Sequence, residues 1–204
     1  MDAPLFIAGT GSFAAEIASW AADAGRSPAG LIELRDPARI GTTIHGLPVV
    51  DAHRPPREAR AVLGIGGDRR DVWEPLERAG WTAERVVHPR AEVAETAVVA
   101  TGVTVGPFAV IGAETRVEAH AIISRGALVG HHVSIGEFAN LNPGANVGGN
   151  SDIGAGATLG MGSTVVNGIR VGVAATVAAG AVVVRDVDRN TRVQGVPARR
   201  YMER

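Results

Sequence analysis

A ladder of aliphatic residues at every sixth position constrains the fold of this chain more than any other feature. All sixteen ladder positions hold Val, Ile or Leu. A period of six fits neither an amphipathic helix nor an alternating strand, and it is typical of a parallel β-helix in which three hexapeptides form a coil of about eighteen residues. Each ladder residue is expected to point inward and to stack on neighbouring coils. The ladder consists of Val93, Val99, Val105, Ile111, Val117, Ile123, Val129, Ile135, Leu141, Val147, Ile153, Leu159, Val165, Val171, Val177 and Val183.

Glycine often follows a ladder residue directly, and a small residue often stands four positions after it. We expect the glycines at the corners of the coils, where they accept backbone angles that other residues resist. Examples of the two positions are Gly106, Gly112, Gly130, Gly136, Gly148, Gly154, Gly160 and Gly172, and Ala109, Ala121, Ala139, Ala157 and Ala175.

The first ninety residues show a different order of strand, glycine turn, helix and strand. Residues 4–8 predict a buried strand, residues 9–14 a glycine turn, the residues up to about 24 a helix, and residues 31–34 a second strand. This order matches a nucleotide-binding βαβ unit, in which glycines let the backbone approach a phosphate and the helix N-terminus favours its charge. The candidate substrate-binding residues here are Gly9, Gly11, Ser12, Phe13 and the acidic Glu33. An ordinary strand-to-helix turn is the alternative.

The remaining N-terminal residues extend this α/β pattern. Residues 35–58 predict a surface loop, residues 61–68 a third strand with a second glycine turn, residues 69–79 a helix, and residues 81–87 a last strand. Gly66 and Asp68 of the second turn are further candidates for binding the substrate. A unit over residues 1–87 is too small for a dehydrogenase, so we expect it to bind the nucleotide part of a substrate. Residues 88–204 then form the β-helix domain with a C-terminal tail.

Composition excludes several classes of function. The 204 residues include no cysteine, which excludes disulfides and a thiol nucleophile. The net charge of −1 argues against nucleic acid as a partner. The sequence has no apolar run of eighteen residues, and its first residues lack a basic leader. We therefore expect a cytoplasmic protein without membrane insertion.

Three histidines lie within the ladder region, namely His120, His131 and His132. The last two stand near a corner, where side chains project outward and a histidine can act as a general base near neutral pH. Two solvated surface histidines are the alternative. A zinc site like that of the solenoid carbonic anhydrases needs a different histidine spacing, and adjacent side chains on a strand diverge. The sequence therefore predicts no catalytic metal.

Taken together, these motifs resemble the bacterial hexapeptide-repeat acetyltransferases that carry an N-terminal nucleotide-binding domain. This family includes sialic acid O-acetyltransferases and nucleotide-linked 4-amino-sugar N-acetyltransferases. The resemblance covers the whole chain and depends on residues 9–14, 65–66, 129–131, 135–138 and 195–199. It implies a homotrimer that uses acetyl-CoA. The resulting fold class is an α/β, Rossmann-like βαβ domain followed by an all-β left-handed parallel β-helix.

The resemblance also implies roles for individual residues. His131 is the general base for direct attack of an amine or hydroxyl on the thioester, and Gly149 supplies a backbone N–H to the oxyanion. Residues expected to contact the cofactor are Asn140, Asn142, Gly149, Met161, Ala179, Gly180, Pro197, Arg199 and Arg200.

Several positions depart from the family pattern, and they cluster where the substrate is expected. His132 replaces the usual acidic residue after the base, so that a backbone carbonyl or Glu137 is left to orient His131. Ser124 replaces an asparagine, and Phe13 a histidine. The preferred hypothesis is an acetyltransferase acting on a nucleotide-activated sugar. Two alternatives stay open: an acyltransferase for a small amine or alcohol without a nucleotide, and an inactive trimeric binding protein.

Overall fold

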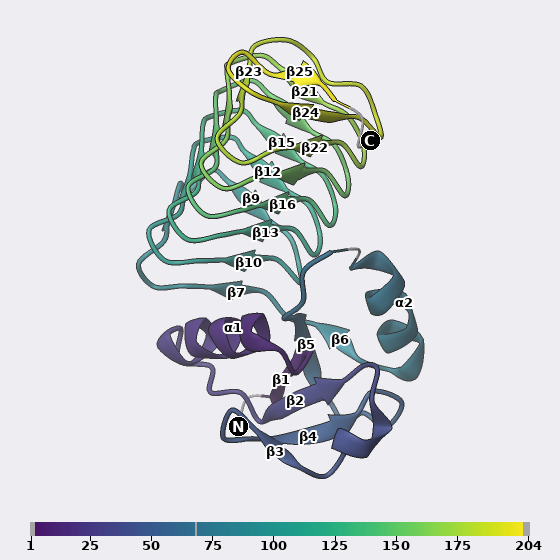
Figure 1. Ribbon diagram of the computed structural model, residues 1–204. Coiled ribbons are helices and arrows are strands. Elements are labelled where there is room, and N and C mark those ends of the chain that lie inside the picture. The colour runs from purple at the N-terminus through teal and green to yellow at the C-terminus, as the bar shows by residue number, and fades with distance from the viewer. Residues whose placement is uncertain (1–2, 68, 202–204) are drawn as a thin grey trace. The chain divides into compact units, whose positions relative to one another are not determined.

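The computed structural model describes residues 3–67 and 69–201 (Figure 1). The chain divides into two compact units, Met1–Pro89 and Arg90–Arg204, which we call the N-terminal unit and the solenoid unit.

A six-stranded sheet in the order β3-β4-β2-β1-β5-β6 forms the centre of the N-terminal unit. All neighbours pair in parallel except the hairpin of β3 and β4. In the described part of this unit, two α-helices and one 3₁₀ turn, η1, accompany these strands. The elements are β1 (Leu5–Ala8), α1 (Ser12–Asp23), β2 (Gly30–Glu33), η1 (Pro37–Arg39), β3 (Thr43–Ile44), β4 (Leu47–Asp51), β5 (Arg60–Leu63), α2 (Arg70–Ala79), β6 (Thr82–Ala83) and β7 (Val86–Val87).

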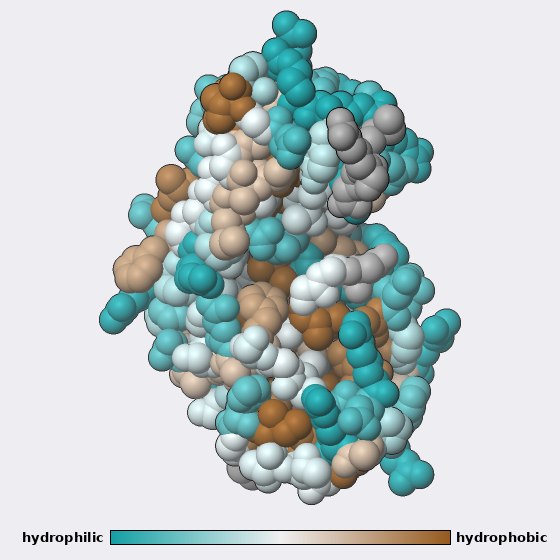
Figure 2. All heavy atoms as spheres, in the orientation of Figure 1, coloured by the Kyte–Doolittle hydropathy of each residue, from teal (hydrophilic) through white to brown (hydrophobic). Residues whose placement is uncertain are grey.

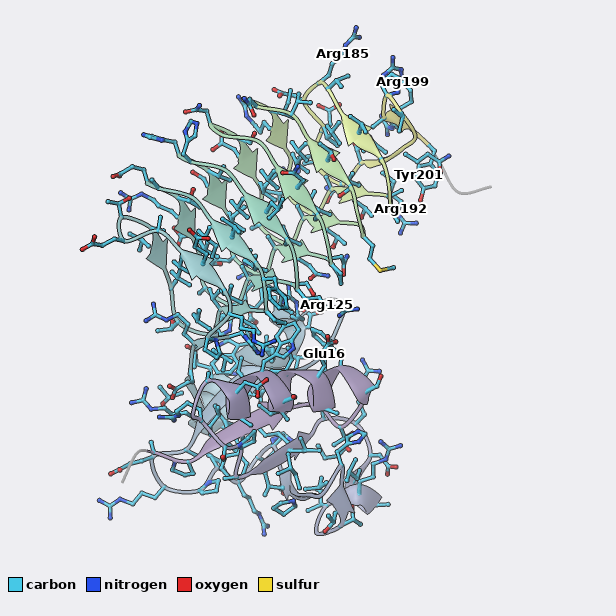
Figure 3. All side chains as sticks on the ribbon, turned by 90° about the vertical axis from the view of Figure 1, so that its left-hand side faces the viewer. Glu16, Arg125, Arg185, Arg192, Arg199 and Tyr201 are labelled. Carbon is cyan, nitrogen blue, oxygen red and sulfur yellow. The ribbon has the colours of Figure 1, made fainter. Side chains whose placement is uncertain are left out.

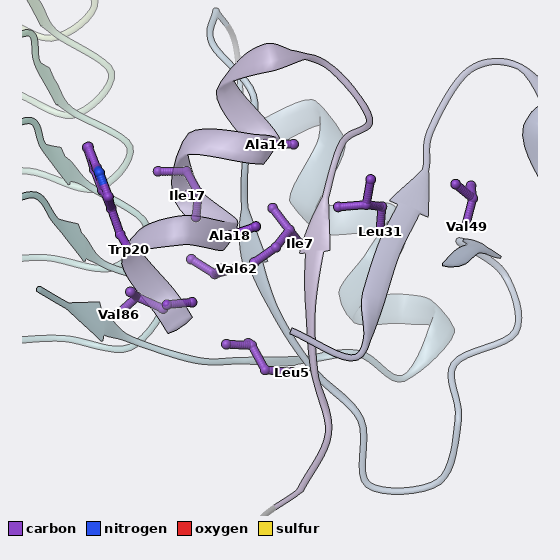
Figure 4. Close-up of a cluster of buried hydrophobic side chains, with 11 residues drawn as sticks. Leu5, Ile7, Ala14, Ile17, Ala18, Trp20, Leu31, Val49, Val62 and Val86 are labelled. Carbon is purple, nitrogen blue, oxygen red and sulfur yellow. The ribbon is translucent and has the colours of Figure 1, made fainter. Parts of the chain in front are cut away.

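Helix α1 packs one apolar stripe against this sheet. Its buried residues include Ala14, Ile17, Ala18 and Ala21, spaced as one face of an α-helix requires. The helix ends where Gly25 adopts a φ of 76°, and Arg26 N–H bonds to the Ala21 carbonyl at 2.8 Å. This is the Schellman arrangement that glycine favours. The buried cluster around α1 joins these residues to β1, β2, β4 and β5 (Figure 4).

The predicted fold class is wrong in describing the first unit as a Rossmann-like domain. Over residues 3–67 and 69–201 the fold is mainly a parallel β-solenoid, and the two α-helices found there hold only 12 and 10 residues. A Rossmann-like unit needs helical crossovers between successive strands. The connection from β2 to β4 instead holds only η1 and the two-residue strand β3. Proline and glycine in this connection, including Pro37, Gly41 and Gly46, disfavour an α-helix there.

The prediction of a surface loop over residues 35–58 is also wrong in part. Residues 47–51 form β4, which pairs with β2 through Val49 and Leu31. The sequence argued against a strand because Pro48 cannot donate a ladder hydrogen bond. The structure accommodates this proline beside the short strand β3, where it faces Thr43.

The solenoid unit is a stack of short strands (Figure 1). Strands β8 to β23 each have two residues and end on a ladder residue, and β24 and β25 follow after the ladder. Its strands are β8 (Glu92–Val93), β9 (Val98–Val99), β10 (Thr104–Val105), β11 (Val110–Ile111), β12 (Arg116–Val117), β13 (Ile122–Ile123), β14 (Leu128–Val129), β15 (Ser134–Ile135), β16 (Asn140–Leu141), β17 (Asn146–Val147), β18 (Asp152–Ile153), β19 (Thr158–Leu159), β20 (Thr164–Val165), β21 (Arg170–Val171), β22 (Thr176–Val177), β23 (Val182–Val183), β24 (Arg192–Gln194) and β25 (Arg199–Arg200).

These strands form three parallel sheets that advance eighteen residues per coil, as the ladder predicts. Val105 pairs with Ile123, and Ile123 pairs with Leu141. Within the solenoid unit, the first sheet contains β10, β13, β16, β19, β22 and β24, with β25 added antiparallel. The second contains β8, β11, β14, β17, β20 and β23, and the third contains β9, β12, β15, β18 and β21. From Val105 to Val183 every ladder residue is buried, and their stacked side chains form the core.

The glycines that follow ladder residues serve a different purpose from the one predicted. Their φ values are not positive. Glycine is needed at these positions because an added side chain would clash with the backbone of the next coil. A Cβ on Gly130 would lie 2.6 Å from the Gly149 nitrogen, and one on Gly136 would lie 2.5 Å from the Ala155 nitrogen. The left-handed residues stand two positions later, as at Gly102, Gly126 and Gly144, and non-glycine residues such as His132 share that conformation.

Candidate active site

One edge of the solenoid carries both histidines of the predicted catalytic motif. His131 and His132 occupy the turn from β14 of the second sheet to β15 of the third sheet, and Gly149 and Asn150 occupy the equivalent turn one coil later. Asn150 N–H donates to the His131 carbonyl at 2.9 Å, which fixes the two turns in register. We call this the histidine edge. Both histidine side chains are exposed along it, so a substrate can reach them.

The imidazole of His131 lies against the backbone of Gly149. A Cβ on Gly149 would stand 2.8 Å from His131 Nε2 and 2.9 Å from Cε1. A side chain at position 149 would therefore displace the His131 ring from this place. The contact brings the predicted general base and the predicted oxyanion donor together on one surface.

The two histidine rings also contact each other. Their Nδ1 atoms are 3.1 Å apart, and the rings meet edge-on at 86°. The expectation that adjacent side chains diverge is wrong here, because His132 has a φ of 54° and is not in an extended strand. A left-handed residue turns its side chain back toward its neighbour. Glu137, the alternative partner, stands after β15 on a different edge.

Apart from Gly149, the predicted cofactor residues of the coils gather on another edge, at or beside the turns from the first sheet to the second. Asn142 follows β16, Met161 follows β19 one coil later, and Ala179 and Gly180 follow β22. We call this the Met161 edge. Small residues keep it open, because a Cβ on Gly162 or Gly180 would meet nothing within 4 Å. Met161 itself is 60% exposed.

Free backbone donors follow the Met161 edge and the histidine edge alike. In the described part of the chain, no backbone acceptor is bonded to the N–H of Gly149, Met161 or Ala179, each two residues past a ladder position. The next N–H along, for example that of Asn150 or Gly180, bonds to the preceding coil. These open N–H groups suit an oxyanion at Gly149 and amide carbonyls of a pantetheine arm at the other two positions.

The C-terminal tail lies at the end of the Met161 edge. Ala198 N–H donates to the Val182 carbonyl at 2.7 Å, and β25 pairs with β24, so Pro197, Arg199 and Arg200 are held beside the last coil. Arg185, Arg192, Arg199 and Tyr201 project from this end of the solenoid unit (Figure 3). Arginines collected there complement the phosphates of a nucleotide.

Asn140, predicted to contact the cofactor, and Ser124, predicted to contact the acceptor substrate, both lie beside Asn142. Asn140 sits on β16, where its Nδ2 lies 3.4 Å from Asn142 Oδ1. Ser124, predicted to face the substrate, occupies the position one coil before Asn142 and is buried. Within one chain it is therefore on the Met161 edge and not on the edge of His131.

The N-terminal unit holds the predicted substrate residues in one pocket of about 490 Å³. Its floor is the glycine turn before α1, and no side chain caps the N-terminus of that helix. Gly9 has a φ of 124°, and a Cβ there would lie 2.6 Å from Ile65 Cγ2, whereas a Cβ on Gly11 would meet nothing within 4 Å. Gly9 is thus required by the fold, and Gly11 leaves room for a ligand. The predicted residues that line the pocket are Gly9, Gly11, Ser12, Phe13, Glu33 and Gly66.

Buried Glu33 lines this pocket and holds its neighbouring residues in place through hydrogen bonds. Its Oε1 accepts the N–H groups of Leu34, Arg35 and Asp36 at 2.9, 2.8 and 3.1 Å, and its Oε2 accepts the Thr10 hydroxyl at 3.0 Å. Burial raises the pKa of Glu33, but these donors outweigh it and hold the pKa below the ordinary glutamate value. A carboxylate this fully bonded shapes the turn after β2.

Sequence reasoning missed the charged residues that complete the pocket. Arg35, Asp36 and Arg39 line it, and all three fall in the stretch interpreted as loop. Arg39 Nη1 donates to the Thr10 hydroxyl at 3.2 Å, and its Nε lies 3.4 Å from Asp36 Oδ2. The single indication in the sequence that these residues line the pocket is that they follow closely after Glu33. Asp68, also predicted to bind substrate, lies outside the described residues.

Residues 3–67 and 69–201 contain neither a metal-binding cluster nor a membrane-spanning helix. No three His, Cys, Asp or Glu side chains come together there as metal ligands would. None of the helices in these ranges has the length and apolarity to cross a membrane.

Comparison with known proteins gives matches among solved structures. No protein-family model and no curated protein matches the chain. A histidine-to-asparagine variant of perosamine N-acetyltransferase from Caulobacter crescentus, solved with CoA and GDP-perosamine, is 28% identical with a TM-score of 0.92, covering 100% of this chain and 99% of that one. The acetyltransferase domain of PglB from Neisseria gonorrhoeae is 26% identical with a TM-score of 0.89, covering 98% and 100%.

The resemblance inferred from the sequence is confirmed. The structural neighbours are hexapeptide-repeat sugar acyltransferases that match over the full length of both units. WeeI from Acinetobacter baumannii, 21% identical with a TM-score of 0.89 and covering 98% of this chain and 100% of that one, shares the fold.

Proposed function

We propose that the chain is an acetyltransferase that moves the acetyl group of acetyl-CoA to an amino or hydroxyl group of a nucleotide-activated sugar. The observation that carries this proposal is the packing of His131 Nε2 on Gly149, which joins a base to an open backbone N–H. The similarity to perosamine N-acetyltransferase solved with CoA and GDP-perosamine, and to the acetyltransferase domain of PglB, supports the same chemistry.

The residues of the histidine edge suit direct transfer. The acceptor nitrogen or oxygen attacks the thioester carbon as His131 Nε2 takes its proton, and the Gly149 N–H stabilises the oxyanion. When the tetrahedral intermediate collapses, the carbon–sulfur bond breaks and CoA leaves as the thiol after taking the proton from His131, which becomes neutral again. No acyl-enzyme is needed, in agreement with a chain that has no cysteine.

The glycine-turn pocket suits the nucleotide of the acceptor. Its open helix N-terminus and the guanidinium groups of Arg35 and Arg39 favour a diphosphate. The Met161 edge and the arginine-rich tail suit the pantetheine arm and the phosphates of CoA. The binding of the two substrates is thus assigned to separate units of the chain.

We further propose that the active enzyme is a homotrimer. In one chain the base and the cofactor residues lie on different edges of the solenoid unit, so a site shared between copies would unite them. Apolar side chains stay exposed on the solenoid, among them Leu128, Val98 and Phe108, and apolar surface also shows in Figure 2. Light scattering should give three times 21.0 kDa. A monomeric mass would reject the shared site.

The test of the activity is CoA release from acetyl-CoA with GDP-, UDP- and dTDP-linked 4-amino-sugars, and with the same sugars lacking the nucleotide. We expect release with at least one nucleotide sugar and a much higher KM without the nucleotide. His131→Ala should lower kcat about 10²–10⁴-fold and leave the thermal midpoint unchanged, because the side chain is exposed and outside the ladder.

Other outcomes identify the alternatives. Equal activity with free amines would show an acyltransferase that does not read a nucleotide. A trimer that releases no CoA with any acceptor would be a binding protein. Full activity in His131→Ala would refute the general-base mechanism.

A further inference from the structure

The hydrogen bond between the two histidines defines where their protons are. Two imidazole nitrogens 3.1 Å apart form a hydrogen bond only if one carries a proton and the other does not. The contact joins Nδ1 of His131 to Nδ1 of His132, so one ring must be protonated at Nδ1 and the other must be an acceptor there.

The proposed role of His131 as the base decides which ring is the donor. His131 Nε2 faces the Gly149 backbone, on the surface where the acceptor and thioester would react. A base needs an unprotonated Nε2, and a neutral imidazole has one proton, which must then be on Nδ1. His131 therefore donates from Nδ1, and His132 accepts with its own proton on Nε2.

The fold holds His132 in place for this role. Its φ of 54° turns the side chain toward His131, and its N–H donates to the Ala113 carbonyl at 2.8 Å. The same left-handed position holds glycine in other coils, as at Gly126 and Gly144, and asparagine at Asn150. The backbone conformation is thus a property of the solenoid turn and does not depend on a histidine.

We propose that His132 is the positioning residue of the general base: a neutral imidazole that, in place of a carboxylate, holds His131 in the tautomer with a free Nε2. The proposal rests on the function proposed above. It assigns a specific job to the residue at which this chain departs from the family pattern. After proton uptake, His131 still donates from Nδ1, so the contact persists through the reaction.

Ring ¹⁵N spectra of histidine-labelled protein test this directly at about pH 8, where free histidine is neutral. His131→Asn identifies the His131 resonances by their loss. We expect wild-type His131 to carry its proton on Nδ1 and His132 on Nε2. His132→Gly keeps the left-handed turn but removes the acceptor, so His131 should shift toward the Nε2-protonated tautomer. His132→Asn, which offers an amide oxygen, should retain the wild-type tautomer.

The kinetic arm uses the same variants. His132→Gly should lower kcat about tenfold with the KM for acetyl-CoA unchanged, and His132→Asn should restore most of the rate. A wild-type His131 protonated on Nε2, or an unchanged tautomer in His132→Gly, would overturn the proposal. So would a full kcat in His132→Gly despite a shifted tautomer. The spectra need no substrate, so a protein that released no CoA would refute the proposed function and leave the tautomer result standing.

Discussion

Gly149→Ala is the substitution that most sharply separates catalysis from folding. The added Cβ would lie 2.8 Å from His131 Nε2, whereas ordinary contacts are 3.4–4 Å, so the ring must move by about 0.6 Å or rotate away. A displacement of about 1 Å in a catalytic group can cost 10²-fold in rate. We therefore expect kcat to fall roughly 10–100-fold, equivalent to about 1.4–2.7 kcal/mol. The N–H of residue 149 is kept, so the loss should come through His131.

Stability should change little in this variant. Gly149 does not have a positive φ, and the clash is with a side chain that faces solvent. Gly130→Ala is the matched control, because its Cβ would meet the Gly149 nitrogen at 2.6 Å, and backbone cannot move without disturbing the coil. That variant should lose about 1–3 kcal/mol of folding stability. Chemical denaturation of both variants measures the difference.

A double-mutant cycle with His131→Ala completes the assay. If Gly149→Ala acts only by displacing the imidazole, it should cost no further activity once the ring is gone. Losses that simply multiply would show that the methyl group blocks the substrate independently of His131. A Gly149→Ala enzyme with full kcat would refute the placement of the base on this edge.

Two further predictions concern the N-terminal unit. Gly11→Val should raise the KM for the nucleotide acceptor at least tenfold and leave that for acetyl-CoA unchanged, since a Cβ at Gly11 meets only open pocket; equal effects on both KM values would make the turn purely structural. Glu33→Gln should lower folding stability by about 1–3 kcal/mol at pH 7. The pKa of Glu33 is lower in the folded protein than its unfolded value of about 4.3, so the ionised carboxylate stabilises the fold above that pH. This stabilisation is lost as the pH falls through the folded pKa. The difference in folding stability between wild type and Glu33→Gln should therefore shrink in acid. A gap that is constant from pH 7 to pH 3.5 would contradict this.

Local periodicity explains why the solenoid was predictable and the N-terminal unit less so. The six-residue ladder places the same kind of residue in the same environment in every coil, so each repeat supports the same structural prediction. Strand β4 offers no such repetition, and its Pro48 argued for a loop although pairing with β2 decides the matter. The connection from β2 to β4 likewise lacks a helical crossover because of tertiary pairing, in which β4 pairs with β2 after only η1 and β3. Arg35 and Arg39 could not be placed in the pocket until this connection was known.

The sequence by itself determined the coil length, the inward ladder, the glycine turn and the identity of the candidate base, because each depends on the chemistry of neighbours in the chain. The tertiary structure alone decided which atoms meet. It put His131 against Gly149, eighteen residues away, and placed Met161 on a different edge of the solenoid. It also turned His132 toward His131 through a left-handed backbone conformation. Contacts between coils and between converging side chains depend on backbone direction in space, which residue types alone do not specify.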